Sequence, residues 1–321
     1  MKLATLNNGQ PDGQLVVISD DGVRYMAAVG VAPSLQNAIE NWDMVESGLQ
    51  ALAQQLANGG GDAVGDAHFA APLPRAWQWL DGSAFDSHGD LMQIVFNQPP
   101  DPKGRPLMYQ GMSHQFLGAR DEVVLPSEDD GIDFEGEFGI ITDFVPMGVS
   151  AQDAMAHIKL VIQINDWSLR TIAPVEMKTG FGWVQAKPAC SAAPFALTPD
   201  ALGQHWRNGR VCLPLLVDWN GQRFGAANGE AMSYGFHELV AHAALTRSLC
   251  AGTIIGSGTV SNANFREVGS SCIAERRGIE IVDTGAAKTA FMAFGDTVRM
   301  EATFLDGATL FGAIEQKVVS R

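Results

Sequence analysis

In the N-terminal region, the spacing of hydrophobic residues is first typical of β-strands and then typical of a helix. Residues 1–6, 14–19 and 23–29 are short apolar runs separated by turn sequences, which predicts three strands. Over residues 34–58 apolar side chains recur every three or four positions, Ser34 can cap the start, and three glycines follow the end, so a helix is predicted. We expect a small N-terminal β/α domain over residues 1–72 and a larger domain over residues 73–321.

The larger part of the chain consists mainly of short apolar runs that are typical of strands. These predicted strands cover residues 123–125, 134–142, 184–187, 211–219, 278–283 and 297–304. Helical spacing occurs over residues 151–165, with Ser150 as a cap, and over residues 236–249. Strands and helices do not alternate regularly, which excludes a doubly wound sheet. The predicted fold class is therefore α+β, predominantly β.

The composition is that of a well-packed globular protein with an acidic surface. Hydrophobic residues make up 46% of the chain, charged residues make up 18%, and the formal net charge is −15. This charge excludes nucleic acid and anionic membranes as expected partners, because both require a basic face. It leaves an anionic substrate open, since a metal ion or a few cations can reverse the field of a site.

The chain shows no targeting or membrane-spanning pattern. Its first residues lack the apolar run of a signal peptide, and no stretch reaches the roughly 18 apolar residues of a membrane span. The 4 cysteines have neither C-x-x-C nor zinc-ligand spacing, so they are expected to be buried, reduced thiols. We therefore expect a cytoplasmic protein.

Glu135 and Glu137 are the first candidates for metal chemistry. Residues two apart on a strand point to the same face, so the two carboxylates are expected side by side. They repel each other unless a cation lies between them, and Mg²⁺ or Ca²⁺ prefers such oxygen ligands. The alternative is an exposed edge strand with two ordinary glutamates, which this motif alone leaves open.

Asp166 is a third candidate carboxylate. It follows the helix predicted over residues 151–165, where the helix dipole disfavours an anion. A carboxylate at that position needs a compensating partner. The partner can be a metal ion or the nearby Arg170.

His88 is the candidate general base. It lies in a Gly- and Ser-rich stretch, predicted to be a loop, together with Asp81 and Asp90. His114 is a competing candidate. The glycine-rich segment 251–262 lacks the lysine of a phosphate-binding loop, so its glycines are interpreted as allowing backbone to approach a ligand closely. No G-x-S-x-G motif supports a serine hydrolase.

In combination, these segments resemble the fumarylacetoacetate hydrolase family. The resemblance covers about residues 75–320 and rests on the order of segments 81–88, 106–111, 131–137, 165–170, 185–188 and 251–261. It implies a mixed β-roll/sandwich catalytic domain that binds a divalent ion, Mg²⁺ or else Ca²⁺ or Mn²⁺. The metal ligands that it implies are Asp81, Glu135, Glu137 and Asp166.

The resemblance also implies catalytic and substrate-binding roles. His88 and Lys187 are the expected catalytic residues. The expected substrate contacts are Tyr109, Arg170 and Thr259. Relatives carry a Glu three residues after the catalytic His, where this chain has Leu91, so Asp90 is the expected acidic partner of His88. Two further substrate contacts of fumarylacetoacetases, a Gln and a Tyr, have no counterpart in residues 171–177.

The activity implied by the resemblance is hydrolysis of a carbon–carbon bond in a β-diketone acid of the fumarylacetoacetate or acylpyruvate type, in the catabolism of tyrosine or other aromatic compounds. The cation is expected to hold two substrate oxygens, Lys187 to stabilise an oxyanion, and His88 to take a proton from water. Alternatives within the family are a 2-oxo acid decarboxylase, isomerase or hydratase. An alternative of another class is a non-catalytic metal-binding module. A homodimer is expected by resemblance alone.

Overall fold

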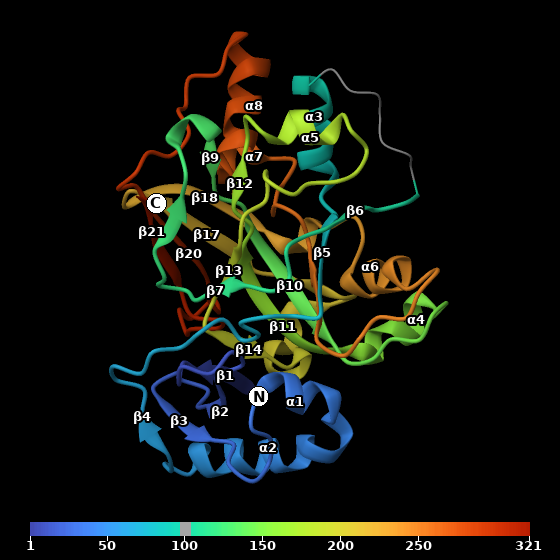
Figure 1. The fold of residues 1–321 in the computed structure, drawn as a ribbon, viewed down its shortest axis with the longest axis vertical. Coiled ribbons are helices and arrows are strands. Elements are labelled where there is room, and N and C mark those ends of the chain that lie inside the picture. The colour runs from blue at the N-terminus through green and yellow to red at the C-terminus, as the bar shows by residue number, and fades with distance from the viewer. Residues whose placement is uncertain (97–103) are drawn as a thin grey trace.

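Most strands in the described part of the chain form one large sheet and a smaller second sheet (Figure 1). The computed structural model describes residues 1–96 and 104–321, with the side chains of residues 95 and 96 left out. In spatial order, the main path of the large sheet is β4 (Asp62–Ala63), β3 (Arg24–Ala27), β2 (Gln14–Ile18), β1 (Lys2–Leu6), β14 (Phe195–Leu197), β11 (Ile158–Asn165), β10 (Gly136–Thr142), β19 (Thr253–Gly256), β5 (Gln78–Ser83) and β6 (Leu107–Gln110). Off this path, β13 (Cys190–Ala192) pairs with β11 and with β7 (Phe116–Leu117).

The second sheet contacts the centre of the large sheet. Its spatial order is β18 (Gln222–Asn228), β17 (Pro214–Trp219), β20 (Thr297–Ala302), β21 (Ile314–Ser320) and β8 (Val123–Leu125). Strand β17 lies against β10, and β20 lies against β11. The remaining strands of the described residues form two short pairs, namely β9 (Ile132–Asp133) with β12 (Ser168–Leu169), and β15 (Trp206–Arg207) with β16 (Arg210–Val211). Mixed sheets with inserted helices make this an α+β fold that is mostly β, as predicted.

The helices gather at the two ends and along one side of the sheets (Figure 1). They are α1 (Leu35–Glu40), α2 (Trp42–Ala57), α3 (Asp86–Phe96), α4 (Ala151–Ala154), α5 (Ala173–Met177), α6 (Phe236–Ala243), α7 (Phe265–Val268) and α8 (Ile273–Thr284). Short 3-10 turns cover Glu128–Asp130, Met155–His157, Pro199–His205 and Gly229–Ala231. None of the helices in the described part of the chain is long and apolar enough to cross a bilayer.

The N-terminal strands and helix are confirmed. The hydroxyl of Ser34 accepts the backbone N–H of Asn37, as expected of a cap, although the predicted helix is divided into α1 and α2 at Asn41. Strand β1 pairs with β14, so the N-terminal strands extend the large sheet of the following region. The domain boundary at residue 72 stays a prediction.

Strands β10 and β11 lie at the centre of the molecule with both faces buried. Phe138 and Ile140 on β10 belong to one hydrophobic core, whereas Ile141 belongs to the other, on the opposite face. The antiparallel register pairs Glu137 with Ile164. A fully buried central strand reads as a continuous apolar run without alternation.

That property explains why the helix predicted over residues 151–165 is wrong. Only Ala151–Ala154 is α-helical, a 3-10 turn follows, and residues 158–165 form β11. Ser150 does cap the short helix. Because a two-sided apolar strand also contains positions at helical spacing, periodicity alone misassigned it. Asp166 therefore follows a strand, and the helix-dipole argument about it does not apply.

Four other predicted elements are also corrected. Residues 278–283 lie within α8, because Cys272 caps its start and Gly285 adopts the left-handed conformation at its end. No strand forms over residues 184–187. The helix predicted over residues 236–249 ends at Ala243, and His88 lies on α3 rather than on a loop.

Candidate active site

Three buried carboxylates from neighbouring strands meet at one point. Asp81 lies on β5, Glu137 on β10 and Asp166 directly after β11. One oxygen of each carboxylate lies within 4.8 Å of an oxygen of the others. The sheet order β11, β10, β19, β5 brings together residues that are far apart in the sequence. The predicted ligands Asp81, Glu137 and Asp166 are thus assembled in one cluster.

The cluster carries negative charge that nearby groups do not fully compensate. Burial, reinforced by Asp81 and Asp166, raises the pKa of Glu137 well above its usual range. Burial and Asp166 likewise raise the pKa of Asp81. Among the described residues, neither carboxylate oxygen of Glu137 has a hydrogen-bond partner. An oxygen-only cluster with an unpartnered buried carboxylate has the donor set that a hard divalent cation requires.

The backbone of β19 lies directly against this cluster. A Cβ atom at Gly256 would lie 2.4 Å from Asp81 Oδ1 and 2.8 Å from Glu137 Oε2, so any side chain there would fill the space next to the carboxylates. The N–H of Gly258 donates a hydrogen bond to Asp81 Oδ1 at 3.1 Å. The glycines of segment 251–262 therefore permit a close approach of backbone to the cluster.

Glu135 differs from Glu137 because cations neutralise it. Its carboxylate pairs with Arg170 and accepts a hydrogen bond from Lys187 Nζ at 3.1 Å. Burial alone would raise the pKa of Glu135, but Arg170 and Lys187 outweigh it and lower the pKa to about 2. Glu135 is not among the three carboxylates that converge, so its role as a fourth metal ligand stays a prediction.

Lys187 joins the two groups of carboxylates. Its ammonium donates to Asp166 Oδ2 at 2.6 Å as well as to Glu135. Burial would lower the pKa of Lys187, but Asp166 and Glu135 together raise it, so the side chain stays charged. Tyr109 Oη donates to the same Asp166 oxygen at 2.7 Å. Lys187 Nζ lies 5.3 Å from the ring centroid of Tyr109 and 5.5 Å from that of Trp183.

Arg170 is held by two carboxylates. Its Nε donates to Asp133 Oδ2 at 2.8 Å, and its other end pairs with Glu135. Asp133 in turn accepts the backbone N–H groups of Ile273 and Ala274 at the start of α8. The guanidinium therefore connects Glu135 to the start of α8 through Asp133. Its predicted contact with substrate stays a prediction, as does that of the buried Thr259.

His88 faces a carboxylate that the sequence did not reveal. Its Nδ1 lies 4.0 Å from Glu275 Oε2 on α8, and the Glu275 side chain is fully buried. Burial lowers the pKa of His88 to about 4, with Glu135 opposing this, so the imidazole is neutral near pH 7. Burial raises the pKa of Glu275 to about 7. Ser261 Oγ donates to the other Glu275 oxygen.

Asp90, the predicted partner of His88, is exposed, whereas Glu275 is the carboxylate that faces the imidazole. The competing candidate His114 is exposed as well. The sequence carried only an incomplete signal for Glu275, because a Glu three residues after a Ser or Thr is typical of a helix start and Cys272 occupies the capping position here. That signal predicts a helix but says nothing of its approach to α3, which is a tertiary contact (Figure 1). Trp183 had no signal beyond its aromatic character.

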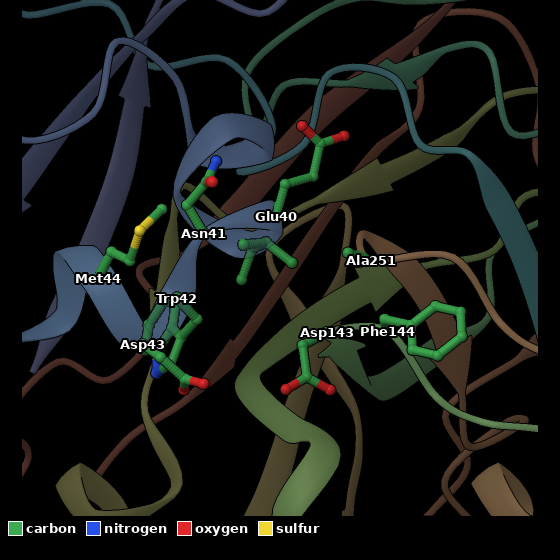
Figure 2. Close-up of a pocket in the computed structure, with 9 residues that line it drawn as sticks. Glu40, Asn41, Trp42, Asp43, Met44, Asp143, Phe144 and Ala251 are labelled. Carbon is green, nitrogen blue, oxygen red and sulfur yellow. The ribbon is translucent and has the colours of Figure 1, made fainter.

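A separate surface pocket of about 280 Å³ lies between the start of α2 and the end of β10 (Figure 2). Figure 2 shows Asp143 and Phe144 on one side, opposite Trp42 and Asp43 on the other. The Asp143 carboxylate is already paired with Lys159 at 3.0 Å. None of the predicted site residues lines this pocket.

Comparisons with known proteins agree with this architecture. A family model described as fumarylacetoacetate (FAA) hydrolase C-terminal matches residues 78–319, and one described as fumarylacetoacetase N-terminal domain 2 matches residues 1–75. The chain belongs to the fumarylacetoacetate hydrolase family. The resemblance inferred from the ordered motifs is thereby confirmed.

Individual relatives carry several different activities. The chain is 26% identical over 157 residues (48% of this chain, 52% of the relative) to the 2,4-didehydro-3-deoxy-L-rhamnonate hydrolase of Sphingomonas sp. (strain SKA58). It is 25% identical over 168 residues (50% of this chain, 49% of the relative) to the Homo sapiens mitochondrial oxaloacetate tautomerase FAHD2A. These matches span about half the length of each relative.

Solved structures match the whole chain at low identity and so support the fold. The maleylpyruvate hydrolase of Sphingobium sp. SYK-6, solved with manganese(II) and pyruvate, aligns with TM-score 0.69 and 17% identity over 100% of this chain and 99% of that one. The fumarylacetoacetate hydrolase of psychrophilic Exiguobacterium antarcticum aligns with TM-score 0.70 and 14% identity over 100% of both chains. The curated relatives are thus named as a hydrolase and a tautomerase, and one protein of the same fold was solved with a divalent metal ion.

Proposed function

We propose that this protein is a metal-dependent hydrolase that cleaves a carbon–carbon bond in a β-diketone acid of the acylpyruvate or fumarylacetoacetate type. The observation that carries the proposal is the pairing of two features. One is a buried carboxylate cluster that needs a cation, and the other is a neutral imidazole facing a buried carboxylate. Lys187, which touches the first group, also affects the second, because its charge helps lower the pKa of His88.

Asp81, Glu137 and Asp166 are the proposed ligands of the divalent ion, and Mg²⁺, Mn²⁺ and Ca²⁺ all suit an all-carboxylate site. Such an ion supplies Lewis-acid polarisation of substrate oxygens. Lys187 and Tyr109 fix the orientation of Asp166 by donating to its Oδ2. Their contacts pre-organise the ligand set, which reduces the reorganisation needed when a substrate binds.

His88 is the proposed general base. Because its pKa is lowered to about 4, it is unprotonated near neutral pH and can take a proton from water. In an acylpyruvate, the water oxygen bonds to the acyl carbonyl carbon, which is the carbonyl farther from the carboxylate. The carbon–carbon bond then breaks, its electron pair goes to the carbon next to the 2-oxo group, and His88 returns the proton there. One water is consumed and two acids are released.

Glu275 and Lys187 support this cycle in different ways. Glu275 is the proposed positioning residue for His88, since its buried carboxylate favours the imidazolium that forms transiently. Lys187 retains its charge because of its two carboxylate partners. A fixed ammonium in a buried site stabilises developing negative charge on the substrate.

The test is turnover of an acylpyruvate and of fumarylacetoacetate, followed as loss of diketone ultraviolet absorbance with and without Mg²⁺. Turnover should require the metal, and His88→Gln and Lys187→Met should each lower kcat by roughly 100-fold or more. His114→Gln, which changes an exposed histidine, is the matched control and should retain wild-type kcat. No turnover on a panel of diketones and 2-oxo acids would favour the non-catalytic metal-binding module.

A tautomerase is the second candidate function, because some relatives are named oxaloacetate tautomerases and a neutral His88 can also move a proton between carbon and oxygen. The reactions differ in their use of water. In H₂¹⁸O the hydrolase should place one ¹⁸O in the released carboxylate, detected by mass spectrometry. Enol–keto conversion of oxaloacetate, without such ¹⁸O-labelled cleavage products, would favour the tautomerase.

The remaining expectations belong to the same proposal. The partner is a small diketo or 2-oxo acid rather than nucleic acid or a membrane, and the reaction serves the catabolism of tyrosine or another aromatic compound. We propose that the protein is a cytoplasmic homodimer. Sedimentation of the purified protein would test whether it is a dimer.

A further inference from the structure

We propose that His88, Cys272 and Glu275 form a second metal site that selects zinc, and that zinc bound there inhibits the enzyme. The inhibitory part of this inference rests on the proposed function, whereas the binding part does not. The three residues come from two helices that pack against each other, α3 and α8 (Figure 1).

The geometry of the three side chains suits a shared ion. A ring nitrogen of His88, the Sγ of Cys272 and a carboxylate oxygen of Glu275 all lie within 4.8 Å of one another. Zinc–ligand bonds of about 2.0–2.3 Å require somewhat shorter separations between ligand atoms, so a small approach of α3 toward α8 completes the site. Cys272 and Glu275 are already fixed relative to each other, because the thiol caps α8 and accepts the Glu275 N–H at 3.3 Å.

Two buried atoms in this cluster have no hydrogen-bond partner. Among the described residues, neither His88 Nδ1 nor Glu275 Oε2 has one, and the two lie 4.0 Å apart. The Glu275 side chain is fully buried, so its Oε2 atom bears a desolvation cost. An ion between the two atoms would satisfy both at once. The second Glu275 oxygen is already held by Ser261, which leaves Oε2 free to coordinate.

The donor set separates this cluster from the carboxylate cluster. Asp81, Glu137 and Asp166 offer only oxygen, which suits hard ions such as Mg²⁺. The second cluster offers nitrogen, sulfur and oxygen, a three-ligand combination that favours zinc and leaves one position for water. A cell rich in Mg²⁺ would therefore fill the first site without filling the second.

Zinc binding at this site displaces a proton and blocks a base. Cys272 coordinates as a thiolate, so its S–H proton leaves for solvent. Because coordination releases this proton, zinc affinity should increase with pH. The bound ion occupies the His88 Nδ1 lone pair and the Glu275 carboxylate that faces it. His88 then loses the partner proposed to favour its protonated form.

The binding test uses the full-length protein with Mg²⁺ at saturation. Calorimetric titration with Zn²⁺ should give one further site per chain, and Co²⁺ in its place should give a thiolate-to-cobalt charge-transfer band. Cys272→Ser should abolish the band and weaken zinc binding by more than the roughly 10–100-fold that loss of an outer-shell partner causes. Cys250→Ser, which changes an exposed cysteine, is the matched control and should keep both signals.

A second variant covers the case in which Cys272→Ser does not fold. Glu275→Gln keeps the size of the side chain and removes the anionic ligand, so it should also weaken zinc binding, while its cobalt band, if formed, shifts. Circular dichroism checks that each variant is folded. Equal zinc affinity in wild type and both variants, or a cobalt band that persists in Cys272→Ser, overturns the proposal.

The inhibition test separates this inference from the proposed function. Zinc should inhibit metal-activated turnover of the wild type and of Cys250→Ser, and Cys272→Ser should need at least about tenfold more zinc relative to its own uninhibited rate. If no substrate is turned over, the proposed function fails while the binding result stands. If turnover occurs but zinc binds without inhibiting, only the inhibitory role is overturned.

Discussion

Glu135 and Glu137 are two residues apart, yet their surroundings have opposite electrostatic character. Glu135 is paired with Arg170 and Lys187, which lower its pKa to about 2. Glu137 faces Asp81 and Asp166, and its pKa is raised well above the usual range by burial and by those two carboxylates. The Glu135 carboxylate is thus neutralised by ion pairs within the protein itself.

The other carboxylate, that of Glu137, has no cationic partner of this kind within the described part of the chain, and burial disfavours its anionic form. Buried charges are costly unless they are paired, and Glu137 has no partner among the described residues. The comparison shows that the E-x-E motif combines a glutamate paired with cations and a glutamate that faces other carboxylates, and the second is the one proposed to require a metal ion. Substitutions at the two positions should therefore change different properties.

The largest expected effect is on metal binding and activity in Glu137→Gln. Loss of an anionic ligand should weaken Mg²⁺ binding strongly and lower kcat/KM by about 1,000-fold, equivalent to roughly 4 kcal/mol of transition-state stabilisation. Near neutral pH the metal-free variant should be more stable than the metal-free wild type, because glutamine removes the carboxyl that the unfolded chain ionises more easily than the folded protein does. Calorimetric Mg²⁺ titration, kinetics and urea unfolding provide the measurements.

Glu135→Gln is the matched control and should behave in the opposite way. It leaves Arg170 and Lys187 with one carboxylate fewer, so the free energy of unfolding should fall by about 3–5 kcal/mol. Its Mg²⁺ affinity should fall less than that of Glu137→Gln. If the two variants lose stability and metal affinity equally, the distinction between the two glutamates is wrong.

A smaller loss of activity is expected when the carboxylate that faces His88 is changed. Glu275→Gln should lower kcat by about 10–100-fold, because the imidazole loses the anion that favours its protonated form. Asp90→Asn should change kcat by no more than about twofold, as for other exposed substitutions. Steady-state kinetics distinguishes them. A large loss in Asp90→Asn alone would restore the prediction made from the sequence.

The smallest effect is on the pH dependence of stability without metal. The folded-state pKa values of Asp81 and Glu137 are raised, so the folded protein keeps protons that the unfolded chain releases above its ordinary values of 3.8 and 4.5. The stability that these two carboxyls contribute is therefore fully present below the unfolded-state values. It is lost as pH rises through the folded-state pKa values, and each unit of pKa difference corresponds to about 1.4 kcal/mol. Urea unfolding in EDTA should show stability falling with pH.

Added Mg²⁺ should make stability increase with pH instead. Metal binding displaces the protons from Asp81 and Glu137, so it grows stronger as pH rises. Calorimetry in buffers of different ionisation enthalpy would detect the released protons. A pH-independent stability in EDTA would contradict the raised pKa values. Glu137→Gln is the control and should remove most of the pH dependence of stability measured in EDTA.

Local patterns determined much of this protein. The N-terminal strands, the Ser34 cap and the strand that carries Glu137 follow from apolar spacing and turn residues. The order of the motifs along the chain was sufficient to identify the family. Both kinds of signal lie in short segments, where spacing reflects the geometry of a strand or a helix turn.

Tertiary structure decided the rest. Strand β11 was misassigned because its burial on both faces removes the alternation by which a strand is recognised. Glu275 was missed because its approach to His88 depends on how α8 packs against α3. The different environments of Glu135 and Glu137 likewise depend on Lys187 and Asp81, which come from distant segments. The charge and burial of a site depend on the segments that fold around it, and the sequence of a single strand does not specify those segments.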